Sequence, residues 1–384
     1  MRVLLFGPYP LPGQPISGGV MAVVRALAQG LARRGVTVGV ASALAGGEDR
    51  DEWDGEVRVY RRGIPRLPRA RGHRAIRSKL LAAARDFRPT LIHAHGTVYY
   101  AAAALDGPWP ALITAHGVAY EEARRSRARG IKARLAWRYD AYLERNVLKR
   151  TRYAIAINPY IRQAFAHYGH ITWFDIPNPV DDAFFEVTRV PERGRLFTPA
   201  RVIPRKGTDI IIQAFAAIAD DVPQAQLRIA GEKDSLSEFV ERCQELAEKA
   251  GIRHRVHFLG NLNRAALLEE YRRAWVTVLP SRQETAPVAI AEAFAAGCPV
   301  IATRVGGVPW MVRDAVDGLL VPSEDAEALA DALAQALSDG EKVNVWSQRT
   351  RLAAQPYRLD AVLDATLTVY ERVKLGDWGV EIGE

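Results

Sequence analysis

Residues 276–303, "VTVLPSRQETAPVAIAEAFAAGCPVIAT", predict a strand, a loop, a helix and a second strand. From residue 287 to residue 296 every position is Ala, Val, Ile, Phe or Pro except Glu292. An unpaired carboxylate on a buried helix would cost several kcal/mol. We therefore expect Glu292 to accept hydrogen bonds, either from sugar or ribose hydroxyls or from a buried Arg or backbone amide of the protein.

A second acid, Glu284, lies eight positions before Glu292, in the expected loop. Two carboxylates could be the pair of a glycosidase. Eight helical residues span about 12 Å, whereas glycosidase carboxylates lie roughly 5 to 9.5 Å apart, so the spacing argues against hydrolysis. Pro287 suits the first turn of the helix, with Thr285 or Ala286 just outside it.

The same alternation continues along the whole chain. Amphipathic stretches at residues 19–34, 208–219, 236–250 and 326–337 alternate with short aliphatic runs. These runs are "RVLLFG", "TVGVAS", "VRVY", "LIHAH", "ALITAH" and "YAIAIN", then "RLFTPA", "QLRIAG", "RVHFLG", "VTVLPS", "PVIAT" and "GLLVP". The pattern predicts an α/β protein with mainly parallel sheets. About twelve strands with a break near residues 176–194 suggest two Rossmann-like, doubly wound domains rather than one sheet. Since ligands bind beyond the carboxyl ends of such strands, we expect the two domains to face each other across a cleft.

The segment "IPNPVDDAFFEVTRVPERG", residues 176–194, is rich in Pro and charge and has no clear periodicity, which is typical of a linker. We predict an N-terminal domain over residues 1–180 and a C-terminal domain over residues 181–360. Residues 361–384 are expected to form a helix and tail that pack back on the N-terminal domain.

Composition excludes several classes of protein. The chain of 384 residues contains two cysteines, Cys243 and Cys298, which argues against a disulfide framework and against a Cys-rich metal site. The N-terminal stretch lacks the pattern of a signal peptide, and no apolar run approaches the roughly 18 residues of a membrane span. We expect a cytoplasmic protein.

Charge is distributed unevenly. Residues 1–180 contain 28 Lys and Arg against 13 Asp and Glu, a net charge of +15, whereas the remainder has a net charge of −7. Within the basic stretch 124–150, apolar residues lie among the cations, namely Ile131, Leu135, Trp137, Tyr139 and Leu143. This pattern suits either an anionic membrane surface or a solvated helix face. No nucleic-acid partner is expected, because no helix-turn-helix, zinc pattern or aromatic RNA-binding strand accompanies the charge.

Two loops suggest anion binding. Gly18 and Gly19 fall where a helix begins, after the first strand, although the dinucleotide and P-loop fingerprints are absent. Arg201, Arg205 and Lys206 precede a helix that starts near residue 207 or 208. Cations at a helix N-terminus oppose its dipole, so either an anion such as a diphosphate lies between them, or the loop is simply solvated.

The two histidines of "LIHAHG", His93 and His95, are spaced two residues apart on an expected strand. We expect their side chains to point to opposite faces, and therefore predict no metal site.

Residues 280–312, "PSRQETAPVAIAEAFAAGCPVIATRVGGVPWMV", resemble the E-x7-E segment of retaining glycosyltransferases of the GT-B fold, family 4. Four further features appear in the family's usual order, so the resemblance covers nearly the whole chain. They are Gly18-Gly19, "ITAHG" with His116, "IPNPVDDAFF", and Arg201 with Lys206.

The resemblance implies a role for each matching residue. Glu292 would bind the ribose of a nucleotide, and Glu284 the transferred sugar. Four residues are expected in the catalytic group, which are His116, Glu284, Arg201 and Lys206. The donor-binding set would be Gly18, Gly19, Arg201, Lys206, Gly260, Asn261, Leu262, Glu284, Thr285, Ala286, Pro287, Val288 and Glu292. No metal or other cofactor is expected, because Arg, Lys and the helix dipole would neutralise the leaving phosphate.

Within this set, Arg201 and Lys206 would hold the diphosphate with the backbone of Gly19 and the helix start near Val288, and His116 would touch the donor sugar near the reacting carbon. The backbone around Gly260 would contact the base. The chain departs from the family at Thr285 to Pro287, where many members have Gly, and Pro287 offers no amide to a phosphate.

The implied function is retaining transfer of a sugar from a nucleotide-diphosphate sugar, with UDP or GDP as the nucleotide, to a hydroxyl of a glycan or lipid-linked acceptor. The transfer would belong to cell-surface polysaccharide or glycolipid synthesis, and the protein would be cytoplasmic and peripheral at the inner membrane leaflet. Residues 65–72 and 117–130 are the expected acceptor loops. The alternatives are a nucleotide-sugar epimerase of related fold and a non-catalytic, membrane-docked protein that binds a nucleotide sugar.

Overall fold

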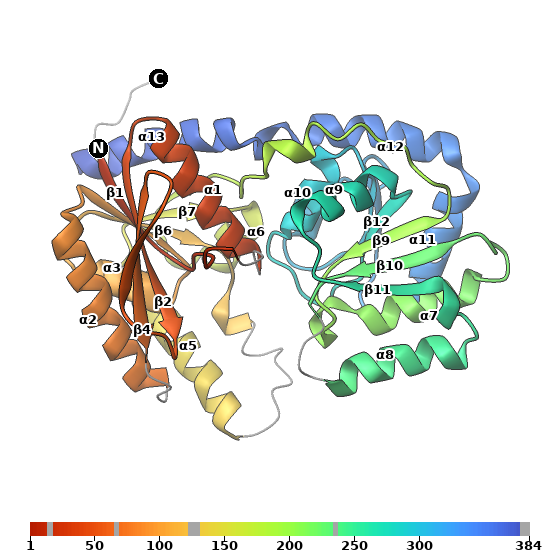
Figure 1. Cartoon of the computed structure of the whole chain (residues 1–384), viewed down its shortest axis with the longest axis horizontal. Helices are drawn as coiled ribbons and strands as arrows, with labels where there is room; N and C mark the ends of the chain where they lie inside the picture. Colours follow the sequence, from red (N-terminus) through yellow and green to blue (C-terminus); the bar gives the residue numbers. More distant parts are fainter. Residues whose placement is uncertain (14–17, 65–68, 122–130, 233–236, 377–384) are drawn as a thin grey trace. The chain divides into compact units, whose positions relative to one another are not determined.

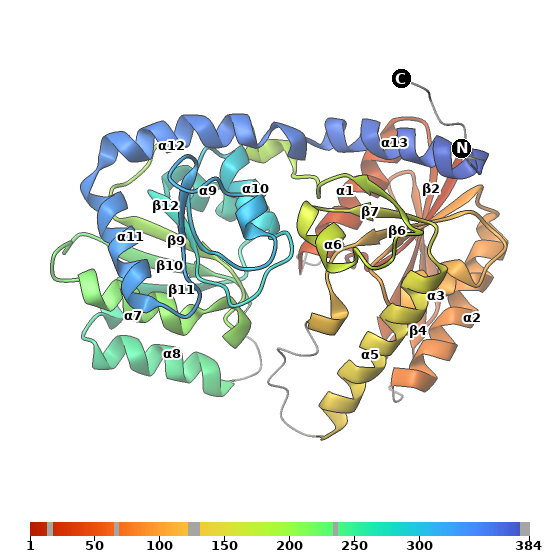
Figure 2. The ribbon, with the colours of Figure 1, turned by 180° about the vertical axis from the view of Figure 1, so that it is seen from behind.

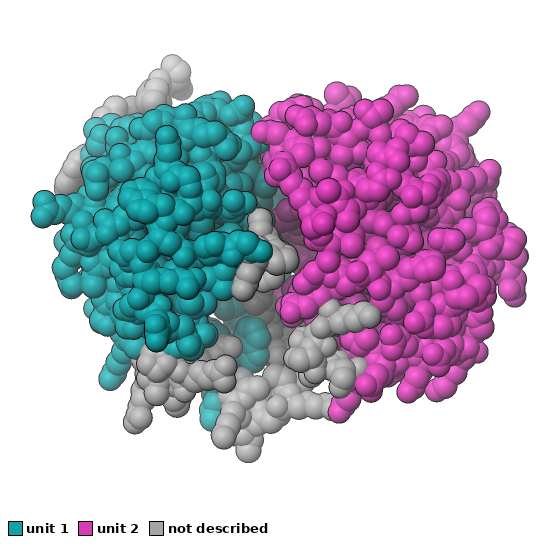
Figure 3. All heavy atoms as spheres, in the orientation of Figure 1, with its two compact units in different colours: residues 1–179, 359–384 teal, residues 180–358 magenta. Residues whose placement is uncertain are grey.

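The computed structural model describes residues 1–13, 18–64, 69–121, 131–232 and 237–376. The chain divides into two compact units, Met1–Pro179 with Leu359–Glu384 and Val180–Arg358 (Figure 3). The first boundary lies one residue before the predicted one, and the returning segment starts at Leu359 rather than at residue 361.

Unit 1 contains a sheet in the order β3-β4-β2-β1-β5-β6-β7-β8. Its strands run parallel except β3, which pairs with β4 in the antiparallel direction. The strands are β1 (Arg2–Phe6), β2 (Thr37–Ala45), β3 (Arg50–Asp54), β4 (Val57–Ile64), β5 (Leu91–His95), β6 (Ala111–Ala115), β7 (Tyr153–Ala156) and β8 (Thr172–Asp175). The helices are α1 (Gly19–Arg33), α2 (Arg69–Phe87), α3 (Tyr99–Leu105), α5 (Ile131–Arg150), α6 (Pro159–Ala164) and α13 (Leu359–Leu375) (Figure 1).

Both faces of this sheet are covered. In β1, Val3 and Leu5 belong to the apolar cluster formed with α1 and α13, whereas Leu4 and Phe6 belong to the cluster formed with α2 and α3. Alternate residues of a strand point to opposite faces, so β1 is buried on both sides from Val3 to Phe6, and these four residues are all apolar.

The C-terminal helix α13 packs against α1, and the two helices lie side by side in both views (Figures 1 and 2). A Cβ added at Gly30 of α1 would lie 2.7 Å from Cδ1 of Leu363, so the two helices approach closely where Gly30 has no side chain. Arg34 also bonds Asp360 at 2.7 Å, and Asp364. The last helix of the chain is therefore part of unit 1.

Unit 2 contains a parallel sheet in the order β11-β10-β9-β12-β13-β14. Its strands are β9 (Arg195–Pro199), β10 (Gln226–Ala230), β11 (Val256–Gly260), β12 (Val276–Leu279), β13 (Val300–Thr303) and β14 (Gly318–Val321). The α-helices are α7 (Thr208–Ile218), α8 (Ser237–Lys249), α9 (Arg264–Arg273), α10 (Val288–Ala295), α11 (Ala326–Ser338) and α12 (Gly340–Ala353). Short 3-10 helices are η1 (Asp182–Phe184), η2 (Pro204–Lys206), η3 (Arg253–Arg255), η4 (Val308–Trp310) and η5 (Gln355–Tyr357).

The adjacent strands β9 and β12 determine where the site residues gather. Leu196 of β9 packs into the cluster with α7, α8 and α11, whereas Phe197 packs into the cluster with α10 on the other face. Because β9 and β12 are parallel neighbours, the loops that leave their carboxyl ends lie next to each other. Arg201 to Lys206 lie in the first loop and Glu284 lies in the second.

Every aliphatic run predicted as a strand forms one, and β3 and β8 are additional strands that the pattern did not predict. Both are edge strands, and neither contains a buried residue. Edge strands that pack little against a core need no apolar run, so their sequences give no such signal.

Candidate active site

The loop after β9 and the loop after β12 are in direct contact. Gly207, which precedes α7, has φ +67°, and a Cβ on it would lie 2.0 Å from the carbonyl oxygen of Pro280. Only glycine combines this backbone conformation with so close an approach. The contact brings Arg205 and Lys206 to Glu284.

Glu284 is buried, with 5% of its surface exposed. Its Oε1 accepts hydrogen bonds from Nζ of Lys206 and, at 2.7 Å, from Oγ of Ser281, and Nη1 of Arg205 lies 3.9 Å from Oε2. Burial alone would raise the pKa of Glu284, but the charges of Lys206 and Arg205 and the two hydrogen bonds hold that pKa below its ordinary value. The carboxylate is therefore ionised and ready to accept further hydrogen bonds.

The cations of the first loop are held in different ways. Lys206 has three N–H donors and gives one of them to Glu284. Arg205 is exposed and donates to the carbonyl of Gln283 at 3.2 Å. Arg201 is exposed, and its Nε lies 3.6 Å from Oε2 of Glu232, a residue that follows β10. The structure thus brings Lys206 and Arg205 to Glu284 and pairs Arg201 with another acid.

Glu292 is half-buried on α10, and its donor is a tyrosine rather than the Arg or backbone amide considered above. The hydroxyl of Tyr271 lies 3.0 Å from Oε2 of Glu292 and 3.2 Å from the carbonyl oxygen of Ala289. Burial raises the pKa of Glu292 to about 7, with a smaller contribution from Asp181, while the Tyr271 hydrogen bond acts in the opposite direction. Nothing in the sequence pattern pointed to Tyr271.

The helix start differs from the prediction by one position. α10 begins at Val288, and Pro287 precedes it with an extended backbone (φ −65°, ψ 115°), so Pro287 is not in the first turn. Thr285 and Ala286 are half-buried in the loop before it. The first amides of a helix generally have no acceptor within it. In α10 they begin at Val288, and the amide of Ile290 donates to the carbonyl of Pro287 at 3.0 Å. The missing N–H of Pro287 therefore takes no amide away from the first turn.

Gly260 ends β11 with φ +69°, and its carbonyl accepts a hydrogen bond from the amide of Gly231 at 2.9 Å. Asn261 is exposed and Leu262 is half-buried, and Asn263 then caps α9 by accepting from the amide of Ala266. The three predicted base-contact residues therefore form the turn between β11 and α9, at the same edge of the sheet as Glu284.

The remaining predicted residues lie in unit 1. Gly18 precedes α1 with φ +92°, and a Cβ there would meet nothing within 4 Å, while Gly19 is the first helical residue and is exposed. The first turn of α1 contains no acidic residue. His116 follows β6 and is half-buried.

The prediction that His93 and His95 point to opposite faces is wrong. Residues i and i+2 of a strand share a face, and the centroids of these two rings are 4.3 Å apart. Nδ1 of His95 lies 2.9 Å from Nε2 of His116. Burial lowers the pKa of His116 to about 4, although Asn178 opposes this, and burial also lowers the pKa of His93 to about 3. His116 is therefore a neutral imidazole hydrogen-bonded to a second buried histidine.

His93 itself is bonded to Tyr370 at 2.8 Å and to Thr114 at 2.6 Å. Within the described residues, no group of three or more His, Cys, Asp or Glu side chains has an arrangement that could hold a metal ion.

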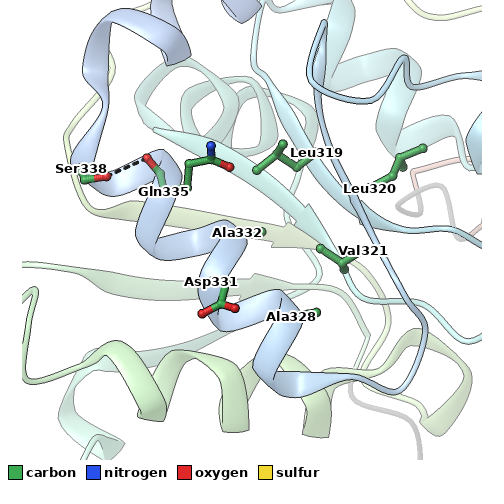
Figure 4. A pocket seen from close by; sticks show the side chains of 8 residues that line it. All are labelled: Leu319, Leu320, Val321, Ala328, Asp331, Ala332, Gln335 and Ser338. Atoms are coloured by element: carbon green, nitrogen blue, oxygen red, sulfur yellow. Dashed lines mark hydrogen bonds between the residues drawn. The ribbon is translucent and has the colours of Figure 1, made fainter.

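An open hollow of about 540 Å³ lies elsewhere in unit 2, beside β14 and α11 (Figure 4). None of the predicted site residues lines it. Its lining residues are Leu319, Leu320, Val321, Ala328, Asp331, Ala332, Gln335 and Ser338.

The expected acceptor loops lie mostly outside the described residues, since residues 65–68 and 122–130 are not described. Over the part of the chain that the structure describes, we find no helix with the length and apolar composition needed to span a membrane.

Both halves of the chain match known families. Residues 180–353 match Glycosyl transferases group 1, and residues 17–184 match Glycosyltransferase Family 4. The two domains are those of a GT-B glycosyltransferase. The fold and the glycosyltransferase resemblance predicted from the sequence are thereby confirmed.

Among curated relatives of this GT-B glycosyltransferase, D-inositol 3-phosphate glycosyltransferase of Saccharomonospora viridis is 36% identical over 175 residues, which is 44% of this chain and 41% of the relative. Exopolysaccharide phosphotransferase of Streptomyces coelicolor is 32% identical over 190 residues, which is 49% of this chain and 19% of the relative. The matches thus span less than half the length of these relatives.

Solved structures match the GT-B chain over nearly its whole length. Sucrose-phosphate synthase from Thermosynechococcus elongatus has a TM-score of 0.82 at 23% identity, covering 98% of this chain and 100% of that one. HepE of Anabaena in complex with UDP-glucose has a TM-score of 0.75 at 19% identity, covering 97% and 100%. At these identities the likeness establishes the fold.

Proposed function

We propose that this protein transfers a sugar from a nucleoside-diphosphate sugar to a hydroxyl of a glycan or lipid-linked acceptor. The supporting observation is the Lys206–Glu284 ion pair at the edge of the unit 2 sheet, with Arg205 beside it. A cation next to an ionised carboxylate suits a ligand that has both a diphosphate and sugar hydroxyls. In this assignment Lys206 and Arg201 bind the diphosphate, Glu284 the transferred sugar and Glu292 the ribose.

The proposed reaction retains the anomeric configuration. The bond between the anomeric carbon and the diphosphate oxygen breaks, and the acceptor hydroxyl forms a new bond to the same carbon from the same face. The acceptor proton passes to the leaving diphosphate oxygen, so no carboxylate acts as the base. His116, whose pKa is lowered to about 4 by burial, contributes a hydrogen bond as a neutral imidazole.

No metal ion takes part in the proposed reaction, because Lys206, Arg201 and the start of α10 neutralise the leaving diphosphate. Transfer should then persist in excess EDTA. Loss of transfer in EDTA, with recovery on adding Mg²⁺ or Mn²⁺, would contradict this assignment.

The acceptor proposal is supported by the charge of the first 180 residues, which is +15. Such a surface favours an anionic acceptor, and one relative is named for a phosphorylated inositol and another for an exopolysaccharide. We assign the protein to cell-surface polysaccharide or glycolipid synthesis on the cytoplasmic side of an anionic membrane.

The first experiment is a thermal shift with UDP, GDP, ADP and a short single-stranded oligonucleotide, repeated with Glu292→Ala. Saturation at a hundredfold excess over Kd adds about 2.7 kcal/mol to the unfolding free energy, which a melting curve registers. One nucleoside diphosphate should stabilise the protein but not the variant. Stabilisation by the oligonucleotide alone would contradict the proposal.

The matching nucleotide sugars then test the reaction itself. Transfer to an added acceptor, with the anomeric configuration retained, is the expected result. Inverted product would rule out the proposed mechanism. Conversion of the donor into an epimerised nucleotide sugar would favour the epimerase alternative, and tight donor binding without any turnover would favour a non-catalytic binding protein.

A further inference from the structure

Arg282 lies two residues before Glu284 and contacts three loops at the carboxyl edge of the unit 2 sheet. Its Nη1 and Nη2 lie 2.9 and 3.0 Å from the two carboxylate oxygens of Asp209, in the first turn of α7. Its Nε lies 2.8 Å from Glu324, which follows β14, and Nη1 also donates to the carbonyl of Pro204. One guanidinium thus joins the loops that follow β9, β12 and β14.

Backbone contacts of the same segment strengthen this connection. The amide of Arg282 donates to the carbonyl of Arg205 at 2.8 Å, and the guanidinium of Arg205 donates to the carbonyl of Gln283 at 3.2 Å. The loop with Lys206 and the loop with Glu284 are therefore bonded to each other by the residues that directly precede the Lys206–Glu284 ion pair.

The bond geometry between Arg282 and Asp209 suits a role in positioning Lys206 more than a general role in stability. A two-point bond between Arg and a carboxylate fixes orientation as well as distance. Asp209 is buried, with 6% of its surface exposed, and it lies three residues after Lys206. Lys206 has a flexible four-carbon side chain, so the place of its ammonium group depends on how firmly the backbone at Lys206 is held.

We propose that Arg282 is a positioning residue of the donor site, which holds the loop of Lys206 against the loop of Glu284 and so sets the place of the cation that meets the diphosphate. The role in donor binding rests on the proposed function, whereas the role in holding Lys206 does not. Arg282 itself need not touch the ligand.

The first test measures how fast Lys206 reacts with an amine-acylating reagent. The folded protein is labelled, then digested, and the acylated fraction of each lysine is measured by mass spectrometry of the peptides. Lys249, whose side chain is 78% exposed, is the internal standard. In Arg282→Gln we expect Lys206 to be acylated several-fold faster relative to Lys249. If Arg282→Gln alone does not fold, the double variant Arg282→Gln/Asp209→Asn replaces it in the test. The double variant removes the charges of both Arg282 and Asp209, so Asp209 is not left as a carboxylate without the Arg282 guanidinium.

Arg255→Gln is the matched control. Arg255 also lies in unit 2 and donates to three backbone carbonyls, those of Ala219, Val222 and Ala225, at 2.5 to 2.8 Å. Its loss should lower the melting temperature and leave the acylation ratio of Lys206 unchanged. An unchanged ratio in the Arg282 variants, or an equal rise in Arg255→Gln, would overturn the proposal.

The second test measures the Kd of UDP and GDP. Arg282→Gln should weaken nucleotide binding about tenfold, equivalent to roughly 1.4 kcal/mol. Arg282→Lys should bind nucleotide no better than Arg282→Gln, because a Lys side chain cannot form the two-point bond to a carboxylate. Arg255→Gln should bind normally. Unaltered affinity in Arg282→Gln would overturn the donor-site role. If the unaltered protein binds none of UDP, GDP and ADP, the proposed function fails, and the acylation ratio still decides whether Arg282 positions Lys206.

Discussion

The hydroxyl of Tyr271 lies 3.0 Å from Oε2 of Glu292, and the two residues come from neighbouring helices, α9 and α10. Tyr271 is fully buried, with the rings of Phe184 and Phe197 packed edge-on at 5.6 and 5.1 Å between centroids. A rigid donor therefore fixes one oxygen of the carboxylate proposed to bind ribose.

Tyr271→Phe should weaken nucleoside diphosphate binding by about three- to tenfold, the typical cost of one lost hydrogen bond. It should also raise the pKa of Glu292 further, because the Tyr271 bond is what opposes the effect of burial. Calorimetric titration with UDP and GDP at several pH values measures both. An unchanged Kd together with an unchanged pH midpoint would show that Tyr271 does not act on Glu292.

Donor binding should strengthen as pH rises through about 7, because Glu292, with a pKa raised to about 7, accepts ribose hydrogen bonds best when ionised. The effect of this group on stability has the opposite sign. Since its folded pKa lies above the unfolded value, its contribution is fully present below the unfolded pKa and is lost as pH rises through about 7.

Glu292→Gln should remove both of these pH dependences. Melting temperatures with and without nucleotide, between pH 5.5 and 8, give the two slopes from one set of samples. A pH dependence of binding that survives in Glu292→Gln would assign it to another group.

Lys206→Met should destabilise the protein by about 3–5 kcal/mol, because it leaves the buried, ionised Glu284 without its closest counter-charge. Lys206→Met/Glu284→Gln should recover part of this loss, although both variants should lose transfer. Urea unfolding provides the free energies. Equal stability of the unaltered protein and Lys206→Met would mean that the pair contributes nothing to the fold.

Because the pKa of Glu284 is held below its ordinary value, its contribution to stability is present above that ordinary value and is lost as pH falls through the lowered pKa. The unaltered protein should therefore lose stability in acid more steeply than Lys206→Met/Glu284→Gln does.

His95→Phe should lower kcat about tenfold, or roughly 1.4 kcal/mol in the barrier, because His95 holds the ring of His116. His95→Asn keeps a hydrogen-bonding group and should lose less. Steady-state kinetics would separate this effect from donor affinity, which should change little. A loss confined to the KM of the donor would contradict a role through His116.

The exposed side of α5 should bind anionic vesicles. Leu135 and Tyr142 are 59% and 62% exposed, and the exposed cations Arg138, Arg145 and Lys149 continue the same stripe at spacings of three and four residues. Each basic residue near such a surface contributes about 1 kcal/mol. Arg138→Glu/Arg145→Glu should abolish co-sedimentation with anionic vesicles.

Lys249→Glu, a charge reversal on the exposed part of α8, is the control for this experiment. It should leave vesicle binding intact. Equal binding to neutral and anionic vesicles, or equal loss in both variants, would show that the α5 stripe is not a membrane surface.

The sequence by itself determined every strand except the exposed edge strands β3 and β8, and it determined the need of Glu292 for a donor. Strand runs are recognisable because the part of a strand that is covered on both faces is apolar at successive positions, as β1 is from Val3 to Phe6. A lone acid in the apolar run of α10 likewise needs a partner wherever that partner lies. The family resemblance identified Lys206 and Glu284 as site residues, and both meet in the structure.

The tertiary structure alone decided which residues complete the site. Tyr271 precedes Glu292 by 21 positions and reaches it because α9 and α10 pack on the same side of the unit 2 sheet. Arg282 finds Asp209 because β9 and β12 are neighbours although their sequences are far apart. Periodicity reports which face of an element is buried, whereas the partner across that face depends on strand order, which no local pattern of residues encodes.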